Sequence, residues 1–422
     1  MRKPIHPSPP ATASRRRFLQ SAAGMVAGSV LAGRARAAEG GASIGGTLRV
    51  GLIGCGGRGT GAAAQALAAD PNVRLVALGD AFRDRLQNSL ETLRGQPGIG
   101  DKVEVPDHRC HVGFQAYQQV IESGVDVVLL ATPPHFRPLH IRAAVAAGKH
   151  LFVEKPVAVD APGVRAVLAA CAEARARKLA VVSGLAMRYS HGHREAIRRI
   201  QEGALGKIRT LQAVDFRGPL WVKPRQPGWT EMEYQMRNWY YFTWLSGDFN
   251  VEQHIHLLDL CAWAMKEEYP VSAMGIGGRQ VRTEPEYGNI YDHHAVIYEY
   301  AGGEKLHAYC RQQAGCVDEI SAEITGSAGS ATLNRGRLVI TGAHPWRFEG
   351  TPNDQFLTEH EELFASIRRG EPINNGEYMA KSTLMAILGR MATYTGRKIT
   401  WDQALHSQED LSPPSYDWDA VP

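Results

Sequence analysis

A glycine-rich turn near the start of the chain carries the clearest chemical signal. It comprises Gly54, Cys55, Gly56, Gly57, Arg58 and Gly59, after an apolar run at residues 47–53 and before an Ala-rich stretch at residues 60–69. In the order strand, turn, helix, the first glycine permits the tight turn, the second lets the backbone approach a pyrophosphate, and the third brings helix and strand together. Free N–H groups and the helix dipole would then face an anion. The turn predicts a dinucleotide site with these cofactor-binding residues: Gly54, Gly56, Gly57, Arg58 and Gly59.

An acid follows the next strand pattern. The β-branched run at residues 73–78 ends in Gly79 and Asp80. A carboxylate at the end of the second strand binds the adenosine ribose hydroxyls and repels a 2′-phosphate, so Asp80 favours NAD over NADP. Arg83 and Arg85 follow closely and would suit a 2′-phosphate, which leaves NADP as the alternative. A plain turn or N-cap role is the structural alternative for Asp80.

Two more strand patterns continue the same architecture. Residues 125–131 form a nearly continuous apolar run, as a parallel strand covered on both faces does, and residues 150–153 form a shorter one after a predicted helix at residues 138–147. Alternating strands and helices predict an α/β doubly wound parallel sheet, whose ligands lie at the carboxyl ends of the strands. The residues that follow these two strands are therefore expected at the cofactor: Thr132, Pro133, His135, Glu154 and Lys155.

These features together resemble the glucose–fructose oxidoreductase / inositol dehydrogenase family, usually called Gfo/Idh/MocA. Besides the glycine-rich turn, the resemblance rests on Ala131-Thr132-Pro133 with His140 downstream, Glu154-Lys155-Pro156, residues 247–259, and the tail at residues 396–401. It implies a Rossmann domain followed by an open-faced β-sheet domain. The implied activity is hydride transfer between a nicotinamide and a sugar or inositol hydroxyl, with Lys155 beside both.

The second half fits this expectation through its own patterning. Short strand-like runs without long helices between them predict a mainly antiparallel sheet with one free face in an α+β domain: residues 208–216, 271–276, 294–300, 305–312, 319–325 and 330–333. A free face commonly serves assembly, so a homo-oligomer is expected. We assign residues 47–157 to the NAD(P)-binding domain and residues 158–422 to the substrate and oligomerisation domain. The helices predicted at residues 355–369 and 376–395 are free to pack back on the first domain.

The resemblance also implies an acid–histidine pair. Members of the family carry Asp-x-x-x-His on a helix, and alignment on His256 and Asp259 places Glu252 at the acid position. Residues four apart on a helix share a face, so Glu252 and His256 are expected to converge on one substrate group, with Asp259 near the same stripe. The chain departs from the family pattern in having Glu252 instead of Asp and His254 instead of Gly.

Hydride removal determines the roles of these groups. An alcohol carbon gives up hydride only as its hydroxyl loses a proton, so a base must lie within ~3 Å of that oxygen and a cation must stabilise the developing charge. His256 suits the base because an unperturbed imidazole has a pKa near ~6.5. Lys155 is expected to orient the hydroxyl or relay the proton, and Glu252 to bind neighbouring hydroxyls. A hydrogen-bonded core histidine is the alternative for His256.

Aromatic and polar residues of the second half suggest a carbohydrate or polyol substrate. Rings stack on sugar C–H faces while polar groups bind hydroxyls, although oligomer packing explains the aromatics equally well. The expected substrate-binding residues are Arg188, Tyr189, Trp239, Tyr240, His254 and Asp259. No metal is expected, because zinc needs three protein ligands and His254 and His256 would point to different faces of one helix. The chain after residue 37 has no basic stripe for nucleic acid.

The first 37 residues have the three parts of an export signal. They hold seven Lys and Arg and no acid, with the run Arg15-Arg16-Arg17, then 13 weakly apolar residues at 21–33, then Ala35-Arg36-Ala37 as a small-x-small cleavage site. The paired arginines indicate the twin-arginine export machinery, and the apolar stretch is too short for a permanent membrane span. We predict a signal peptide at residues 1–37, a linker at residues 38–46 and a periplasmic or otherwise exported protein. A disordered basic tail is the alternative.

The net charge supports this division. The chain carries +4 from 47 Lys and Arg against 43 acids, and removal of the seven amino-terminal cations leaves 40 against 43. The positive balance therefore belongs to the signal. An exported nicotinamide enzyme has no obvious pool of free cofactor, so the cofactor is expected to stay bound and to be recycled within each cycle. Oxidation of one sugar with reduction of another meets this condition, as does an NAD-dependent glycosidase; a non-catalytic sugar-binding protein with structural NAD is the third alternative.

Overall fold

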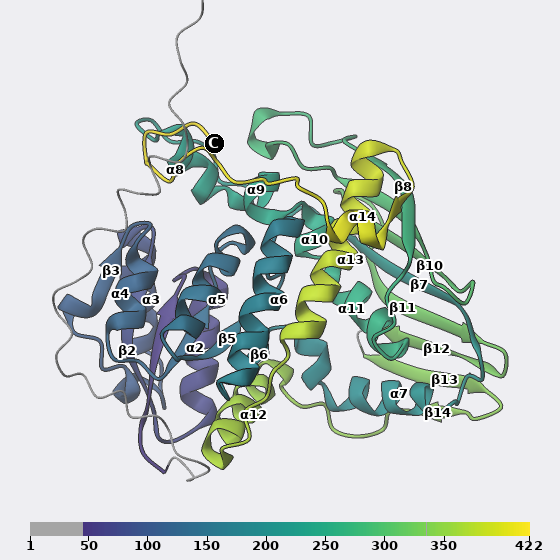
Figure 1. The fold of residues 1–422 in the computed structure, drawn as a ribbon, viewed down its shortest axis with the longest axis horizontal. Coiled ribbons are helices and arrows are strands. Elements are labelled where there is room, and N and C mark those ends of the chain that lie inside the picture. Colours follow the sequence, from purple (N-terminus) through teal and green to yellow (C-terminus); the bar gives the residue numbers. More distant parts are fainter. Residues whose placement is uncertain (1–44, 335) are drawn as a thin grey trace, which may run out of the picture. The chain divides into compact units, whose positions relative to one another are not determined.

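A six-stranded parallel sheet forms the first half of the computed structural model, which describes residues 45–334 and 336–422 (Figure 1). Its strands run in the order β3-β2-β1-β4-β5-β6. Their bounds are β1 (Leu48–Ile53), β2 (Val73–Asp80), β3 (Cys110–Val112), β4 (Val127–Leu130), β5 (His150–Val153) and β6 (Val181–Ser183). The order reverses between β1 and β4, the point at which doubly wound sheets bind their ligands.

Helices cover this sheet because its central strands β1 and β4 are apolar apart from Arg49. Every residue of β4 is buried, and so are five of the six residues of β1. The helices of this half are α2 (Gly57–Ala69), α3 (Arg83–Arg94), α4 (Ala116–Glu122), α5 (Arg137–Ala146) and α6 (Ala161–Ala176). Asp160 begins α6 by accepting a hydrogen bond from the Gly163 N–H at 2.8 Å.

The parallel sheet extends beyond the predicted domain boundary at residue 157. Helix α6 and strand β6 belong to it, because β6 pairs in parallel with β5. The boundary predicted from the sequence was therefore too early. Strand β6 has only three residues, and an apolar run of that length is too short to predict a strand from the sequence.

A second sheet of nine strands follows, in the order β14-β13-β12-β11-β7-β10-β9-β8-β15. Its pairings are antiparallel except between β7 and β10. The strands are β7 (Ile208–Arg217), β8 (Ser272–Gly278), β9 (His293–Glu299), β10 (Lys305–Gln312), β11 (Glu319–Gly326), β12 (Gly329–Asn334), β13 (Arg337–Gly342), β14 (Trp346–Arg347) and β15 (Ile399–Thr400). The fold is thus the expected Rossmann sheet followed by a mainly antiparallel sheet.

Helices pack against the second sheet from one side. Contacts join α7 (His191–Gln201) to β13, α11 (Ile255–Ala264) to β7 and β11, and α13 (Gly376–Thr395) to β8 and β9. Side chains of β9 and β10 alternate between buried and partly exposed, and Met274 and Ile276 of β8 are exposed. The open face expected from the alternation is therefore present, and the homo-oligomer stays a prediction.

The carboxyl-terminal helices return to the parallel sheet. Helix α12 (Gln355–Arg369) packs against α2 and β6, and α13 contacts both α6 of the first half and β8 of the second (Figure 1). The remaining helices are α8 (Glu231–Arg237), α9 (Thr243–Ser246), α10 (Phe249–Glu252) and α14 (Trp401–Leu405), with 3₁₀ turns at η3 (Pro134–Phe136), η4 (Ala186–Tyr189) and η5 (Trp239–Tyr241).

The predicted signal peptide and most of the predicted linker lie outside the described residues. None of the described helices combines the length and apolar character that a bilayer-spanning segment needs.

Candidate active site

A cavity of about 1050 Å³ lies at the carboxyl ends of the parallel strands. The glycine-rich turn, the end of β2 and the residues after β4 and β5 line one part of it. Residues between 221 and 256 of the second half line another, among them Trp221, Trp239, Glu252 and His256. The cavity is therefore built jointly by the nucleotide half and the second half.

The glycine-rich turn has the geometry of a pyrophosphate cradle. Gly54 has a φ of +98°, in the region that side chains rarely adopt. A Cβ on Gly59 would lie 1.8 Å from the Gly54 carbonyl oxygen, so only glycine permits this approach of α2 to β1. Gly56 precedes α2 as its N-cap, and a Cβ on Gly57 would meet nothing within 4 Å. The free N–H groups at the start of α2 thus border open space, which fits the phosphates of a dinucleotide.

Asp80 lies at the end of β2 on the wall of this cavity. Its carboxylate accepts hydrogen bonds from the Cys55 N–H at 2.6 Å and the Phe82 N–H at 2.8 Å. Burial raises the pKa of the Asp80 carboxyl, while the two N–H donors and Arg85 act in the opposite direction. Each carboxylate oxygen keeps a further lone pair, so Asp80 can accept from ribose hydroxyls as well.

Lys155 and Glu252 form a nearly buried ion pair in the cavity. The Lys155 Nζ donates to Glu252 Oε1 at 2.9 Å and to the Glu252 carbonyl oxygen at 2.5 Å. Only 12% and 11% of the two side chains are exposed. An ammonium group has three donors, so one N–H of Lys155 is left for a substrate hydroxyl.

The expected continuous helix between Glu252 and His256 is not formed, which corrects the prediction that they share one helical face. Helix α10 ends at Glu252 and α11 begins at Ile255. The Phe249 carbonyl accepts from both the Gln253 and His254 N–H groups, and the His256 N–H donates to Gln253 rather than to Glu252. This break leaves the Glu252 carbonyl available to Lys155. Both Glu252 and His256 nevertheless line the cavity.

Buried Arg137 fixes the loops that carry Thr132 and Lys155. It donates to the Thr132 carbonyl at 2.6 Å and to the Pro156 carbonyl. Burial lowers the pKa of Arg137 to about 10, so the guanidinium stays charged near neutral pH. Thr132, Pro133 and Glu154 line the cavity beside Arg137, and so does His140, which lies 3.4 Å from the Thr132 hydroxyl.

Two family models match the chain over these same regions. Residues 48–182 match the oxidoreductase family with an NAD-binding Rossmann fold, and residues 193–332 match the GFO/IDH/MocA C-terminal domain. Together the matches span more than half of the chain. The chain belongs to the Gfo/Idh/MocA oxidoreductase family. Its first domain is an NAD-binding Rossmann domain.

Relatives and solved structures agree with this membership. Inositol 2-dehydrogenase of Rhizobium meliloti (strain 1021) is 26% identical over 324 residues, which cover 76% of this chain and 86% of the relative. The fold is similar to that of aldose-aldose oxidoreductase from Caulobacter crescentus complexed with glycerol, with a TM-score of 0.67, 21% identity and coverage of 84% and 99%. Levoglucosan dehydrogenase in complex with NADH and levoglucosan gives a TM-score of 0.67 at 18% identity, covering 85% of this chain and 100% of that one.

Two residues expected at the substrate of this Gfo/Idh/MocA protein instead form a buried ion pair outside the cavity. Arg188 donates to both carboxylate oxygens of Asp259 at 2.8 Å and to Glu267 at 2.7 Å. Asp259 also accepts from the Ser382 hydroxyl, and the guanidinium of Arg188 lies 3.7 Å from the ring centroid of Tyr378. These contacts join η4, α11 and α13 and leave neither group facing the cavity.

Three further predicted substrate residues also lie away from the cavity. Tyr189 donates to Asn375 at 2.7 Å, and the buried Tyr240 hydroxyl accepts from Gln312 at 2.7 Å. Burial lowers the pKa of His254 to about 4. Of the six residues expected to bind substrate beside the catalytic group of Lys155, Glu252 and His256, Trp239 alone lines the cavity.

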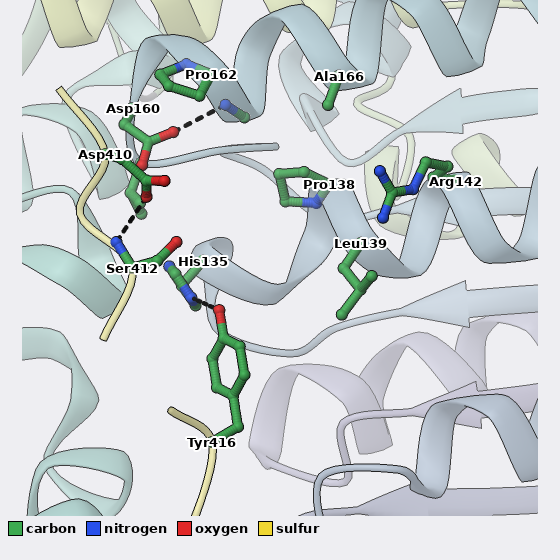
Figure 2. Close-up of a pocket in the computed structure, with 12 residues that line it drawn as sticks. His135, Pro138, Leu139, Arg142, Asp160, Pro162, Ala166, Asp410, Ser412 and Tyr416 are labelled. Carbon is green, nitrogen blue, oxygen red and sulfur yellow. Dashed lines mark hydrogen bonds between the residues drawn. The ribbon is translucent and has the colours of Figure 1, made fainter. Parts of the chain in front are cut away.

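His135 lies in a smaller cavity of about 200 Å³, not with the other predicted cofactor residues. Its Nε2 lies 2.7 Å from the Tyr416 hydroxyl. Figure 2 shows this contact beside Asp160, Asp410 and Ser412. Burial lowers the pKa of His135 to about 4.

The structure adds cavity residues that the sequence did not single out for the site. Among them are Phe82, Asn88, Phe114, Tyr117, Arg137, His140, Trp221, Lys223, Trp229, Met236, Arg237 and Phe356. The family motifs point to His140, whereas the others carry no local signal because their places depend on tertiary packing. Across residues 45–334 and 336–422, no three His, Cys, Asp or Glu side chains are grouped closely enough to hold a metal ion.

Cofactor choice is expected to depend on the charge of Asp80. In the Asp80→Asn variant the affinity for NADP relative to NAD is expected to rise by about tenfold or more, because a carboxylate at contact distance repels a 2′-phosphate by over 1.4 kcal/mol. Fluorescence titration with both cofactors measures the ratio. The exposed Asp107→Asn variant is the control, and an unchanged ratio in Asp80→Asn would contradict the assignment.

Proposed function

We propose that this protein is an exported oxidoreductase that moves hydride to or from a hydroxyl-bearing carbon of a sugar, inositol or glycoside, with its nicotinamide cofactor retained and recycled. The observation that carries the proposal is the Lys155–Glu252 pair. It lies in the cavity that also contains the glycine-rich cradle and His256. The names of the relatives, inositol dehydrogenase and aldose-aldose oxidoreductase, support a polyol or sugar as the substrate.

The residues of the cavity divide the chemistry between them. Bound NAD supplies the acceptor for the hydride. Lys155, held by Glu252, directs its remaining N–H at the substrate hydroxyl and stabilises negative charge there as the proton leaves. His256 accepts that proton, because an imidazole is basic enough near neutral pH and weak enough to release the proton again. Trp221 and Trp239 offer ring faces for the C–H surface of a sugar, and Glu252 accepts from a neighbouring hydroxyl.

A substrate screen without added cofactor tests the function. The purified mature protein is mixed with single sugars and polyols, with pairs of sugars and with aryl glycosides, while the nicotinamide absorbance is followed. A requirement for two sugars is the expected result. Net release of the aglycone would identify the glycosidase instead. If product analysis finds that no sugar, polyol or glycoside is converted, and the absorbance does not change even with external NAD, the catalytic proposal is contradicted.

Lys155 is expected to be essential for turnover and not for folding. In Lys155→Met, kcat is expected to fall by about 10²-fold or more, the range for loss of a donor that stabilises developing negative charge, while the cofactor still binds. Steady-state kinetics on the substrate found in the screen measure the effect. Lys381→Met is the matched control, since Lys381 pairs with Glu377 on the surface of α13. Full activity in Lys155→Met would contradict the site assignment.

Export follows from the amino-terminal residues. What supports it is the Arg15-Arg16-Arg17 run, the short apolar stretch and Ala35-Arg36-Ala37. Replacement of Arg15 and Arg16 by lysine is expected to leave the uncleaved protein inside the cell, whereas Arg2→Lys is expected to export normally. Fractionation and amino-terminal sequencing of the mature chain give the result. Normal export of the double variant would contradict the twin-arginine route.

Packing over the cavity supports retention of the cofactor after export. Phe82 and Phe114 line the cavity, and Trp418 packs behind them with ring centroids 5.3 and 4.6 Å away. The carboxyl-terminal segment that carries Trp418, residues 406–422, is anchored by the Leu411 N–H, which donates to Asp160 at 3.0 Å. In Figure 1 this yellow segment runs from α14 to the neighbourhood of α8.

Loss of this packing is expected to release the cofactor faster. In Trp418→Ala the dissociation rate of NAD(H) is expected to rise by about tenfold, because two aromatic contacts of about 0.5–1.5 kcal/mol each no longer hold the cavity wall. Stopped-flow fluorescence with a competing ligand measures the rate. The exposed Val421→Ala variant is the control, and equal rates in Trp418→Ala and wild type would contradict the retaining role of the segment.

A further inference from the structure

Arg58 belongs to the glycine-rich turn, yet its guanidinium is committed to protein partners. Its Nε donates to Glu154, its Nη2 to Glu359 at 3.0 Å and its Nη1 to Gln65 at 2.8 Å. The Phe356 ring centroid lies 5.2 Å from the guanidinium. All three nitrogens are thus engaged before any phosphate arrives. Arg58 lines the cofactor cavity as a fixed part of its wall rather than as a free cation.

Glu359 is the unexpected member of this group, because it comes from α12 near the other end of the chain. Its side chain has no exposed surface, and Oε2 is buried without a hydrogen-bond partner in the described structure. Burial, followed by the nearby Glu154 carboxylate, raises the pKa of Glu359 well above its usual value. A buried carboxyl with only one of its oxygens hydrogen-bonded lowers the stability of the fold. An apolar residue at position 359 would stabilise the packing of α12 on α2 better than glutamate does.

Glu154 connects this group to the reactive lysine. Its side chain is 5% exposed, and its Oε2 accepts a hydrogen bond from the backbone N–H of Lys155 at 3.2 Å. The Glu154 carboxylate fits here because residue 184 is glycine. A Cβ on residue 184 would lie 2.8 Å from Glu154 Oε2 and would clash with it. Both Glu154 and Gly184 line the cavity. The chain of contacts therefore runs from Glu359 through Arg58 and Glu154 to Lys155.

We propose that Glu359 is a positioning residue of the cofactor site. Through Arg58 it fixes the glycine-rich turn and the Glu154 carboxylate in the orientation in which they meet the cofactor, although Glu359 itself lies behind the cavity wall. The proposal rests on the cofactor site of the proposed function and on no particular substrate. Without Glu359, Arg58 keeps only Glu154 and Gln65 as hydrogen-bond partners among the described residues, and Arg58 and Glu154 are free to turn into the space that the cofactor occupies.

The first test compares variants of α12 by their affinity for NADH in the absence of substrate. Loss of a charge-assisted hydrogen bond predicts a Kd about tenfold or more higher in Glu359→Leu. In Glu359→Gln the rise is expected to be only about threefold, because its amide oxygen still accepts from Arg58. Glu362→Leu is the matched control on the same helix, since Glu362 pairs with Arg194, which does not line the cavity. Wild-type affinity in folded Glu359→Leu would overturn the proposal.

A double-mutant cycle separates positioning from a merely structural role. If Glu359 acts through Arg58, then Glu359→Leu is expected to have no further effect on the NADH affinity once Arg58→Leu is present. Independent, additive losses would overturn the proposal, as would a lowered Tm with unchanged affinity. Should Glu359→Leu fail to fold, the same cycle with Glu359→Gln provides the test, with a threefold effect expected only beside Arg58. Because no substrate is added, failure of the oxidoreductase proposal leaves this result interpretable.

Discussion

The pairing of Lys155 with Glu252 is the interaction on which the rest of the site depends. An ammonium group with little solvent around it must be paired, and its direction is fixed only if more than one acceptor holds it. Glu252 supplies both acceptors, its carboxylate and its own carbonyl oxygen. That carbonyl is available because the helix breaks after Glu252, so the His256 N–H bonds elsewhere. The break in the helix after Glu252 thus gives the Lys155 ammonium group its second acceptor.

Three arginines hold the elements that deliver these groups: Arg137 and Arg188 are buried, and the Arg58 side chain is 35% exposed. Arg137 ties the loop after β4 to the loop after β5 through the Thr132 and Pro156 carbonyls. Arg58 ties the glycine-rich turn to Glu154 and α12, and Arg188 ties η4 to α11 through Asp259. A buried guanidinium needs partners, so Arg137 and Arg188 specify places for loops that apolar packing alone would leave loosely defined. Arg58 does the same through its hydrogen bonds to Glu154 and Glu359.

Much of the fold and half of the site follow from local sequence, and the remainder depends on tertiary contacts. Strand β5 and helices α12 and α13 form where their patterns predict, and the glycine-rich turn has the geometry its spacing demands. The family resemblance implied one helix through Glu252 and His256. The chain breaks that helix through a backbone hydrogen-bond shift at Phe249, which leaves no mark in the sequence. Arg188 and Asp259 were expected to bind substrate because the sequence does not show their real partners. Glu267 and Tyr378 contact Arg188, and Ser382 donates to Asp259, and each of these pairs is far apart in the chain. Glu359 looked like any acid of an amphipathic helix.

Transfer of an isotopic label tests the account most directly. The mature protein, supplied with no external nicotinamide, receives a sugar or polyol deuterated at its reactive carbon together with a second, unlabelled sugar. Deuterium is expected on carbon in the reduced second sugar, in proportion to oxidation of the first. Deuterium found only in water, or no transfer unless NAD is added, would contradict a hydride carried between substrates by a cofactor that stays in its site.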